Sequence, residues 1–305
     1  MTNGLKIALA QLNPTVGDID GNLAKVREAR AAAAAAGADL VVYSELAITG
    51  YPPEDLVLKP VFHDDTMKAV AAFAADTSDG GPAVLLGSPW RDDSGLYNAA
   101  LLLDGGKAVA ATRKRHLPNY GVFDEKRVFA EGPLPDPIEF RGVKLGVMIC
   151  EDMWLSDVAR NLAAQAADIL VVLNGSPFEA EKEERMSLAR ARVSETGLPL
   201  LYVNQVGGQD ELVFDGGSFV LDGSGEFALR APDWAEDVAL SEWRHGGDGW
   251  VAQPGPLAEA LGNLEAIYQA MMTGLRDYVR KNRFNGVVLG LSGGIDSALT
   301  LAVAA

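Results

Sequence analysis

The chain has 305 residues, of which 48% are hydrophobic, and a formal net charge of −16 at pH 7. This length predicts one large domain or two smaller ones, with enough apolar side chains for a sizeable core. The acidic balance argues against nucleic acid or an anionic membrane surface as a partner, because both need clustered Lys and Arg. Nucleotides remain possible partners, since backbone amides and helix N-termini can hold their phosphates.

The single cysteine, Cys150, cannot form an intramolecular disulfide, which favours a reducing cytoplasmic location. No apolar run approaches the length of about 18 residues that a transmembrane helix needs. Residues 1–4 lack the basic flank and apolar segment of a secretion signal. We therefore expect a cytoplasmic protein that has no membrane-spanning segment.

Strands and helices are expected to alternate along most of the chain, because short apolar runs alternate with segments of helical spacing. The expected strands cover residues 6–10, 39–43, 83–87, 96–103, 108–112, 143–149, 168–173 and 198–204. The expected helices cover residues 19–36, 59–75, 156–167 and 179–196. A hairpin over 218–228 follows, and the whole pattern predicts the α/β class.

The composition changes after Arg230. Residues 231–256 hold three tryptophans among Gly, Pro and acids without a clear period, which predicts a linker. A helix over about 257–282, a strand over 286–291 and a glycine loop that opens another helix follow. Because the sheet for this last strand does not appear, we expect a sequence truncated within a second domain. The predicted organisation is a domain over 1–230, a linker over 231–256 and the start of a second domain over 257–305.

Cys150 stands where the apolar run 143–149 stops and two acids and a tryptophan follow. A thiol at the end of a buried strand is held rigidly, and the adjoining loop leaves room for a ligand. The position therefore suits a nucleophile. The alternative is a structural thiol, since free cysteine is among the most buried residue types.

Glu45 and Lys114 also follow strand-like apolar runs. One charged residue at a strand end is usually a solvated rim residue, but these two and Cys150 together supply a base, a cation and a nucleophile. Glu45 could take the thiol proton. Lys114 could stabilise the oxyanion that forms when a thiolate attacks a carbonyl, and the backbone N–H of Glu151 is a second candidate donor.

Three stretches of the chain resemble the Glu-Lys-Cys motifs of the nitrilase, or carbon–nitrogen hydrolase, superfamily. They are Tyr43–Pro53, Lys114–Glu125 and Cys150–Trp154, and they agree in order and context over about residues 4–230. The resemblance implies a four-layer αββα sandwich and a catalytic role for Cys150. It also implies a second glutamate that orients Lys114, a position that Glu125 matches. Glu125 could instead be a surface acid beside two basic residues.

Within the superfamily, residues 51–56 and 117–125 most resemble the glutaminase domain of the glutamine-dependent NAD⁺ synthetase family. In that family, the residues that match Tyr120, Ser176 and Lys182 hold glutamine. Ser176 lies in a segment that follows an expected strand, as a substrate loop should. The alternatives are a simple cap or turn for Ser176 and a solvated helix face for Lys182, which has acidic neighbours.

A glycine loop near residue 293 follows an expected strand and opens a helix. Glycines let backbone approach a phosphate, and a helix N-terminus supplies N–H donors. The loop lacks the Gly-Lys-Ser/Thr end of a Walker motif. It resembles the pyrophosphate loop of N-type ATP pyrophosphatases, which implies the start of a Rossmann-like domain; the alternative is a bare glycine turn. The candidate ATP-binding residues are Gly290, Leu291, Ser292, Gly293, Gly294, Ile295, Asp296 and Ser297.

Together, the two resemblances imply the glutamine-hydrolysing half of a NAD⁺ synthetase. The implied partners are glutamine, ATP and deamido-NAD⁺, with ATP and Mg²⁺ serving only the complete synthetase domain and no cofactor or metal serving the glutaminase domain. A homo-oligomer is expected, because domains of this fold usually pair. One alternative is a stand-alone amidase of the same superfamily. The other is a non-catalytic binding module, which the three intact reactive residues disfavour.

Overall fold

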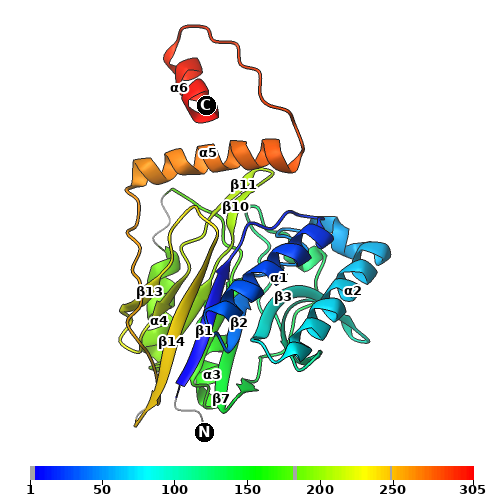
Figure 1. Ribbon diagram of the computed structural model, residues 1–305, viewed down its shortest axis with the longest axis vertical. Helices are drawn as coiled ribbons and strands as arrows, with labels where there is room; N and C mark the ends of the chain where they lie inside the picture. Colours follow the sequence, from blue (N-terminus) through cyan, green and yellow to red (C-terminus); the bar gives the residue numbers. More distant parts are fainter. Residues whose placement is uncertain (1–3, 181–183, 248) are drawn as a thin grey trace.

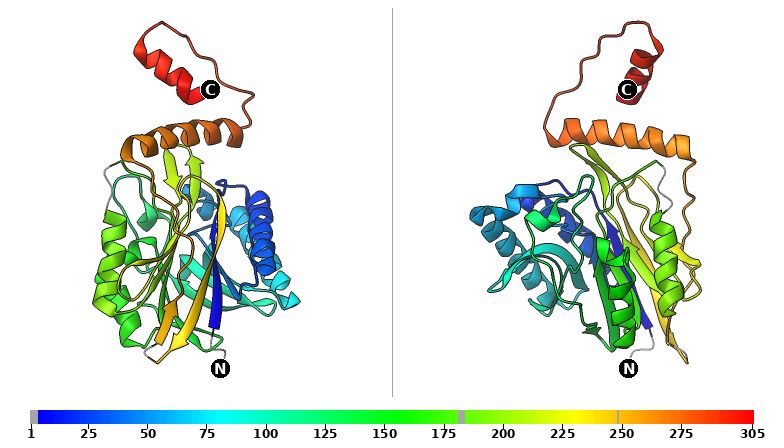
Figure 2. Two further views of the ribbon diagram at one scale, coloured as in Figure 1. Left: turned by 60° about the vertical axis from the view of Figure 1, so that its left-hand side comes forward. Right: turned by 180° about the vertical axis from the view of Figure 1, so that it is seen from behind.

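The computed structural model describes residues 4–180, 184–247 and 249–305. Two β-sheets stack face to face, and helices cover their outer faces (Figures 1 and 2). The order of layers is therefore helix, sheet, sheet, helix. This confirms the four-layer αββα sandwich that the sequence predicts.

The first sheet has seven strands in the order β15-β14-β1-β2-β3-β4-β5. Its strands are β1 (Gly4–Gln11), β2 (Leu40–Tyr43), β3 (Ala83–Asp92), β4 (Gly95–Asp104), β5 (Lys107–Arg113), β14 (Asp237–Gly246) and β15 (Gly249–Ala252). Strands β1, β2 and β3 run parallel, and β3, β4 and β5 form an antiparallel meander. Helices α1 (Ile19–Ala35) and α2 (Pro60–Asp76) cover its outer face with side chains such as Val26 and Phe73.

The second sheet has six strands in the order β13-β12-β9-β8-β7-β6. Its strands are β6 (Ile138–Phe140), β7 (Val143–Ile149), β8 (Ile169–Leu173), β9 (Leu200–Val203), β12 (Phe219–Leu221) and β13 (Phe227–Arg230). Strands β7, β8 and β9 run parallel. Helices α3 (Ser156–Ala164) and α4 (Glu184–Thr196) cover this sheet with side chains such as Leu162 and Val193.

The core between the sheets positions the candidate site. Alternate residues of facing strands, such as Leu9 and Val42 in one sheet and Val147 and Val171 in the other, interlock there. The strands β2, β7 and β8 are each fully buried or nearly so and end at the same edge of the sandwich. The backbone N–H of Glu45, just after β2, donates to the carbonyl of Asn174, just after β8, at 3.4 Å. Residues that follow these strands therefore meet.

The prediction of an irregular linker over 231–256 is wrong for residues 237–246 and 249–252, which form β14 and β15. Strand β14 pairs antiparallel with the whole of β1, from Gly4 with Arg244 to Gln11 with Asp237. Trp243 and Trp250 lie in the core between the sheets. The apolar run of β14 is only three residues long, and Glu242 and Arg244 alternate with the buried Ser241 and Trp243, so no longer apolar run marks the strand in the sequence.

The C-terminal region contains helix α5 (Asn263–Lys281) and helix α6 (Ile295–Ala304), close to the expected positions. The expected strand over 286–291 is absent, because residues 284–292 have no regular structure. A strand needs neighbours to pair its backbone, and no strand of the described ranges pairs with this segment. Two further strands, β10 (Val206–Gln209) and β11 (Leu212–Asp215), form a hairpin under α5 (Figure 1). Among the described helices, none combines the length and apolar character needed to cross a membrane.

Candidate active site

Lys114, Glu45 and Glu125 form a buried ionic cluster. The Lys114 Nζ lies 2.7 Å from Glu45 Oε1 and 2.8 and 2.9 Å from the two oxygens of Glu125. Glu45 and Lys114 are fully buried, and Glu125 is 5% exposed. The folded chain thus brings together three of the four residues that the sequence singles out as catalytic, with one cation between two carboxylates.

Burial and mutual charge set the ionisation of this cluster. Burial alone would lower the pKa of Lys114, but the charges of Glu125, Glu45 and Cys150 together raise it well above its ordinary value. Burial raises the pKa of Glu45 to about 7, because the Glu125 charge adds to burial while Lys114 and Asn98 only partly oppose it. Lys114 therefore stays cationic near neutral pH, and Glu45 is poised to gain or lose a proton there.

Two further polar residues that the sequence analysis assigned no role hold the carboxylates. Asn98 Nδ2, on β4, donates to Glu45 Oε1 at 2.7 Å, and the Tyr51 hydroxyl donates to Glu125 Oε1 at 2.9 Å. Glu45 Oε2 is buried and has no hydrogen-bond partner among the described residues. One oxygen of Glu45 is therefore fixed and the other is free to accept a proton. A signal for Asn98 exists, since it is an amide inside an otherwise apolar strand.

Cys150 begins a short 3-10 turn, Cys150–Met153, directly after β7. Its φ of 45° is in the left-handed region, which is strained for a residue other than glycine. Burial raises the pKa of its thiol well above the ordinary value, and the Glu45 charge adds to this, whereas Lys114 and the Gly175 N–H favour the thiolate. The thiol is thus protonated at rest and needs a base. A Cβ on Gly175 would lie 3.0 Å from Glu45 Oε2 and 3.1 Å from the Tyr51 ring, so a side chain there would crowd both residues.

Asp152 ties the cysteine turn to the segment that carries Lys114. Its carboxylate accepts hydrogen bonds from the backbone N–H groups of Ile149 at 3.1 Å, Arg115 at 3.0 Å and His116 at 2.8 Å. Burial raises its pKa to about 6, against these hydrogen bonds. The sequence places Asp152 inside a motif but gives no sign of this role, because the residues that it joins are far apart in the chain.

Tyr120 and Ser176, two of the predicted substrate residues, lie at different depths. Tyr120 is 53% exposed, and its hydroxyl donates to the Glu151 carboxylate at 2.9 Å. Ser176 is buried, its backbone is held by Asn204, and its hydroxyl has no partner among the described residues. Tyr120 therefore lies at the surface and Ser176 in the interior. Lys182 lies outside the described residues.

The glycine loop contrasts with this cluster. Helix α6 begins at Ile295, as expected, and the Ser297 hydroxyl donates to the Gly294 carbonyl at 3.0 Å. A Cβ at Gly290 or Gly293 would meet nothing within 4 Å. The backbone of the loop is therefore uncovered on this side, and its residues are mostly exposed and do not enclose a nucleotide. Within the described ranges, no group of three or more His, Cys, Asp and Glu is arranged to hold a metal ion.

Two protein families match different parts of the chain. The carbon–nitrogen hydrolase family matches residues 6–244, and the NAD synthase family matches residues 267–305. The chain is 50% identical to a glutamine-dependent NAD(+) synthetase of Rhodobacter capsulatus, over 100% of this chain and 55% of that relative. It is 40% identical to the one of Acinetobacter baylyi, over 98% of this chain and 55% of the relative. The chain therefore spans about half the length of the curated relatives that it matches.

Solved structures give the same grouping. A glutamine-dependent NAD+ synthetase from Acinetobacter baumannii, in complex with ADP, superposes with a TM-score of 0.93 at 40% identity, covering 99% of this chain and 57% of that one. An amidase from Nesterenkonia superposes with a TM-score of 0.69 at 26% identity, covering 83% of this chain and 92% of that one. The motifs, the sandwich and these matches agree, and the chain belongs to the carbon–nitrogen hydrolase family.

Proposed function

We propose that this chain is the glutaminase part of a glutamine-dependent NAD⁺ synthetase. The observation that carries the proposal is the buried cluster of Glu45, Lys114 and Glu125 beside a strained, buried Cys150. The names of the relatives from Rhodobacter capsulatus and Acinetobacter support the choice of glutamine as the amide. The division into a glutaminase part and a synthetase part follows the two family matches, and we place the boundary after β15.

The reaction starts with removal of the Cys150 proton by Glu45, whose pKa of about 7 suits a general base at neutral pH. The sulfur attacks the carbon of the glutamine side-chain amide. Lys114 and the backbone N–H of Glu151 stabilise the oxyanion. Glu45 then gives its proton to the nitrogen, the C–N bond breaks, and ammonia leaves a γ-glutamyl thioester on Cys150.

The second half-reaction needs water. Glu45 takes a proton from a water molecule, which attacks the thioester carbon, and Lys114 again stabilises the oxyanion. The C–S bond breaks, the sulfur regains a proton, and glutamate is released. Glu125 keeps Lys114 charged and in place throughout, helped by the Tyr51 hydroxyl. Tyr120, Ser176 and Lys182 are proposed to hold glutamine.

The glycine loop indicates how the released ammonia would be used. In a complete synthetase, residues 290–297 would hold phosphates of ATP, with Mg²⁺, and ATP would activate deamido-NAD⁺ for amidation by ammonia to NAD⁺. The open backbone at the start of α6 supports this assignment. We also propose that the chain assembles as a homo-oligomer. Light scattering tests this, and a species of only 32.2 kDa would contradict it.

The test of the proposed function is ammonia release from an amide panel. Wild-type chain and the Cys150→Ala variant are assayed with glutamine, acetamide and propionamide. We expect turnover of glutamine well above that of the small amides, and none by the variant. Preference for the small amides would favour the second candidate, a stand-alone amidase. That candidate is supported by the Nesterenkonia amidase, whose solved structures include acrylamide added at its active-site cysteine.

A further inference from the structure

Helix α5 lies across the end of the sandwich, against the β10–β11 hairpin (Figure 2). Its only two buried residues are Thr273 and Asp277, both polar. Helix and hairpin meet almost backbone to backbone, since a Cβ on Gly208 would lie 2.9 Å from the Cα of Gly274. A Cβ on Gly274 would lie 3.0 Å from a methyl group of Val213. Directional polar contacts and close approach, rather than a broad apolar face, hold α5 here.

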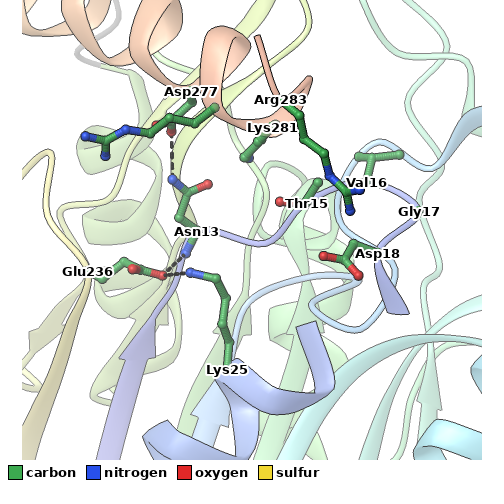
Figure 3. A pocket seen from close by; sticks show the side chains of 11 residues that line it. Asn13, Thr15, Val16, Gly17, Asp18, Lys25, Glu236, Asp277, Lys281 and Arg283 are labelled. Carbon is green, nitrogen blue, oxygen red and sulfur yellow. Dashed lines mark hydrogen bonds and ion pairs between the residues drawn. The ribbon is translucent and has the colours of Figure 1, made fainter. Parts of the chain in front are cut away.

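Asp277 makes the central contact. Its Oδ2 accepts a hydrogen bond from Asn13 Nδ2 at 2.7 Å (Figure 3). The same oxygen accepts a hydrogen bond from the backbone N–H of Gly208 at 2.8 Å. Burial would raise the pKa of Asp277, but hydrogen bonds from Gly208, Asn13 and Arg276 outweigh it and lower the pKa. One carboxylate oxygen therefore joins α5 to β10 and to the β1–α1 loop. We call these two hydrogen bonds the α5 clamp.

Lys281, one helical turn later, adds a third contact. Its Nζ donates to the carbonyl of Pro14 at 2.8 Å, and its half-buried position lowers its pKa to about 8. A cavity of about 780 Å³ lies beside these contacts and is lined by Asn13, Thr15 and Lys281 among others (Figure 3). Separate contacts beside an open cavity therefore hold α5 at this point. The surrounding packing does not compensate for the loss of one of these contacts.

The hairpin side of the α5 clamp leads directly to the candidate active site. Asn204 and Gln205 immediately precede β10. Asn204 binds the backbone of Ser176 at 3.2 and 3.3 Å, and the Gln205 amide donates to the carbonyl of Tyr51 at 3.4 Å. Tyr51 in turn donates to Glu125. Gln205 and Asn204 lie only three and four positions before Gly208, so a short stretch of chain joins the clamp to groups that hold the substrate loop and the ionic cluster.

The loop side of the clamp leads to the same place. Residues 13–17 lie against the segment after β2, where the Gly17 N–H donates to the Thr49 carbonyl at 3.0 Å. Asn22 bridges both segments, because its side chain donates to the carbonyls of Thr15 at 2.8 Å and Ile48 at 3.1 Å. That segment begins at Glu45 and ends at Tyr51. Both routes from α5 therefore converge on residues 45–51.

We propose that Asp277 is a positioning residue for amide hydrolysis, acting through the α5 clamp on residues 45–51 and on Ser176. The inference rests on the proposed glutaminase function. Asp277 lies in the stretch that matches the NAD synthase family, whereas Cys150 lies in the stretch that matches the carbon–nitrogen hydrolase family. The geometry of hydrolysis in one part thus depends on a helix that belongs to the other.

The test compares three variants of the 305-residue chain. Asp277→Ala removes the clamp, and Gly274→Leu wedges α5 away from Val213 without touching a polar group. Asp277→Asn keeps one oxygen in place to accept both hydrogen bonds. Glu265→Ala, an exposed acid on the same helix, is the control. Steady-state glutamine hydrolysis is measured below each variant's melting temperature, with circular dichroism to confirm folding.

We expect Asp277→Ala and Gly274→Leu to lower kcat/KM for glutamine about tenfold, the size expected when the hydrogen bonds that position α5 are lost or displaced. Asp277→Asn and Glu265→Ala should stay within about twofold of wild type, so the loss follows hydrogen-bond acceptance rather than charge or general stability. Wild-type kcat/KM in folded Asp277→Ala and Gly274→Leu would overturn the inference, and so would equal losses in Asp277→Asn and Asp277→Ala. Absence of hydrolysis by the wild-type chain would instead count against the proposed function.

Discussion

The buried ionic cluster and the glycine loop are the two candidate sites of this chain, and they differ in how far folding completes them. Glu45, Lys114 and Cys150 are enclosed by the sandwich and touch partners from distant parts of the chain. Val288 and Ile295, beside the glycine loop, are exposed. A buried charge must be paired for the sandwich to fold at all, so the cluster is assembled with the core. A glycine loop forms locally and depends on other segments to enclose a ligand.

The largest expected effect comes from Cys150→Ala. Without the sulfur no thioester can form, and we expect glutamine hydrolysis to fall by at least about 10³-fold. The turn should survive, because alanine at this position meets the same left-handed φ as cysteine. Ammonia release and circular dichroism are measured together. Full turnover by a folded Cys150→Ala chain would show that Cys150 is not the nucleophile.

Glu125→Gln should have the next largest effect. The change removes one of the two carboxylates that hold the buried Lys114, and we expect kcat to fall about 10- to 100-fold. Asp124→Asn is the matched control. Asp124 precedes Glu125 in the chain, but its side chain is exposed and pairs with Arg127 instead of Lys114. Steady-state kinetics of both variants give the comparison. Equal kcat values would mean that Glu125 does not act on Lys114.

A smaller effect is expected in the pH dependence. Glu45 acts as a base only when ionised, and with a pKa of about 7 its ionised fraction falls as the pH drops below 7. We expect kcat/KM to rise between pH 6 and 8 with a midpoint near 7, a value that belongs to the coupled cluster as a whole.

Asn98→Leu sharpens this pH test. Asn98 donates to Glu45 and favours its charged form, so its loss should move the midpoint to higher pH. Asn161→Leu is the control and should leave the midpoint unchanged, because Asn161 lies on α3 and its amide donates to the Pro135 carbonyl instead. A downward shift in Asn98→Leu, or an equal shift in both variants, would contradict the assignment of Glu45 as the base.

The smallest effects should come from the glycine loop. Ser297→Ala should leave glutamine hydrolysis unchanged, and calorimetry should detect no ATP binding by the 305-residue chain, because the loop residues enclose no nucleotide. A version ending at Asn282 removes exposed Val287 and Val288 and should be more soluble. Micromolar ATP affinity in the 305-residue chain would show that the nucleotide site is already complete.

The sequence predicts the cluster better than it predicts the edges of the fold. The sequence marks Glu45, Lys114 and Cys150 because each follows an apolar strand, and it marks Glu125 because it lies in the same motif as Lys114. Each apolar run can be recognised from its own segment of sequence alone. The roles of Asn98 and Asp152 are not evident from the sequence, since they depend on contacts with residues far away along the chain.

Strand β14 was missed because only its inward residues, such as Ser241 and Trp243, are buried, while charged residues alternate with them. The strand predicted over 286–291 fails for the opposite reason, because an apolar run does not pair without neighbours. Apolar patterning therefore identifies central strands, but pairing partners decide the outer ones.

The most direct test of the account is covalent capture at Cys150. The chain is incubated with a diazo-ketone analogue of glutamine, with and without excess glutamine, and the product is examined by intact mass and peptide mapping. The account predicts one adduct per chain, located on Cys150, whose formation is slowed by glutamine and abolished in Cys150→Ala. An adduct on another residue, or an unmodified Cys150 in a chain that hydrolyses glutamine, would contradict it.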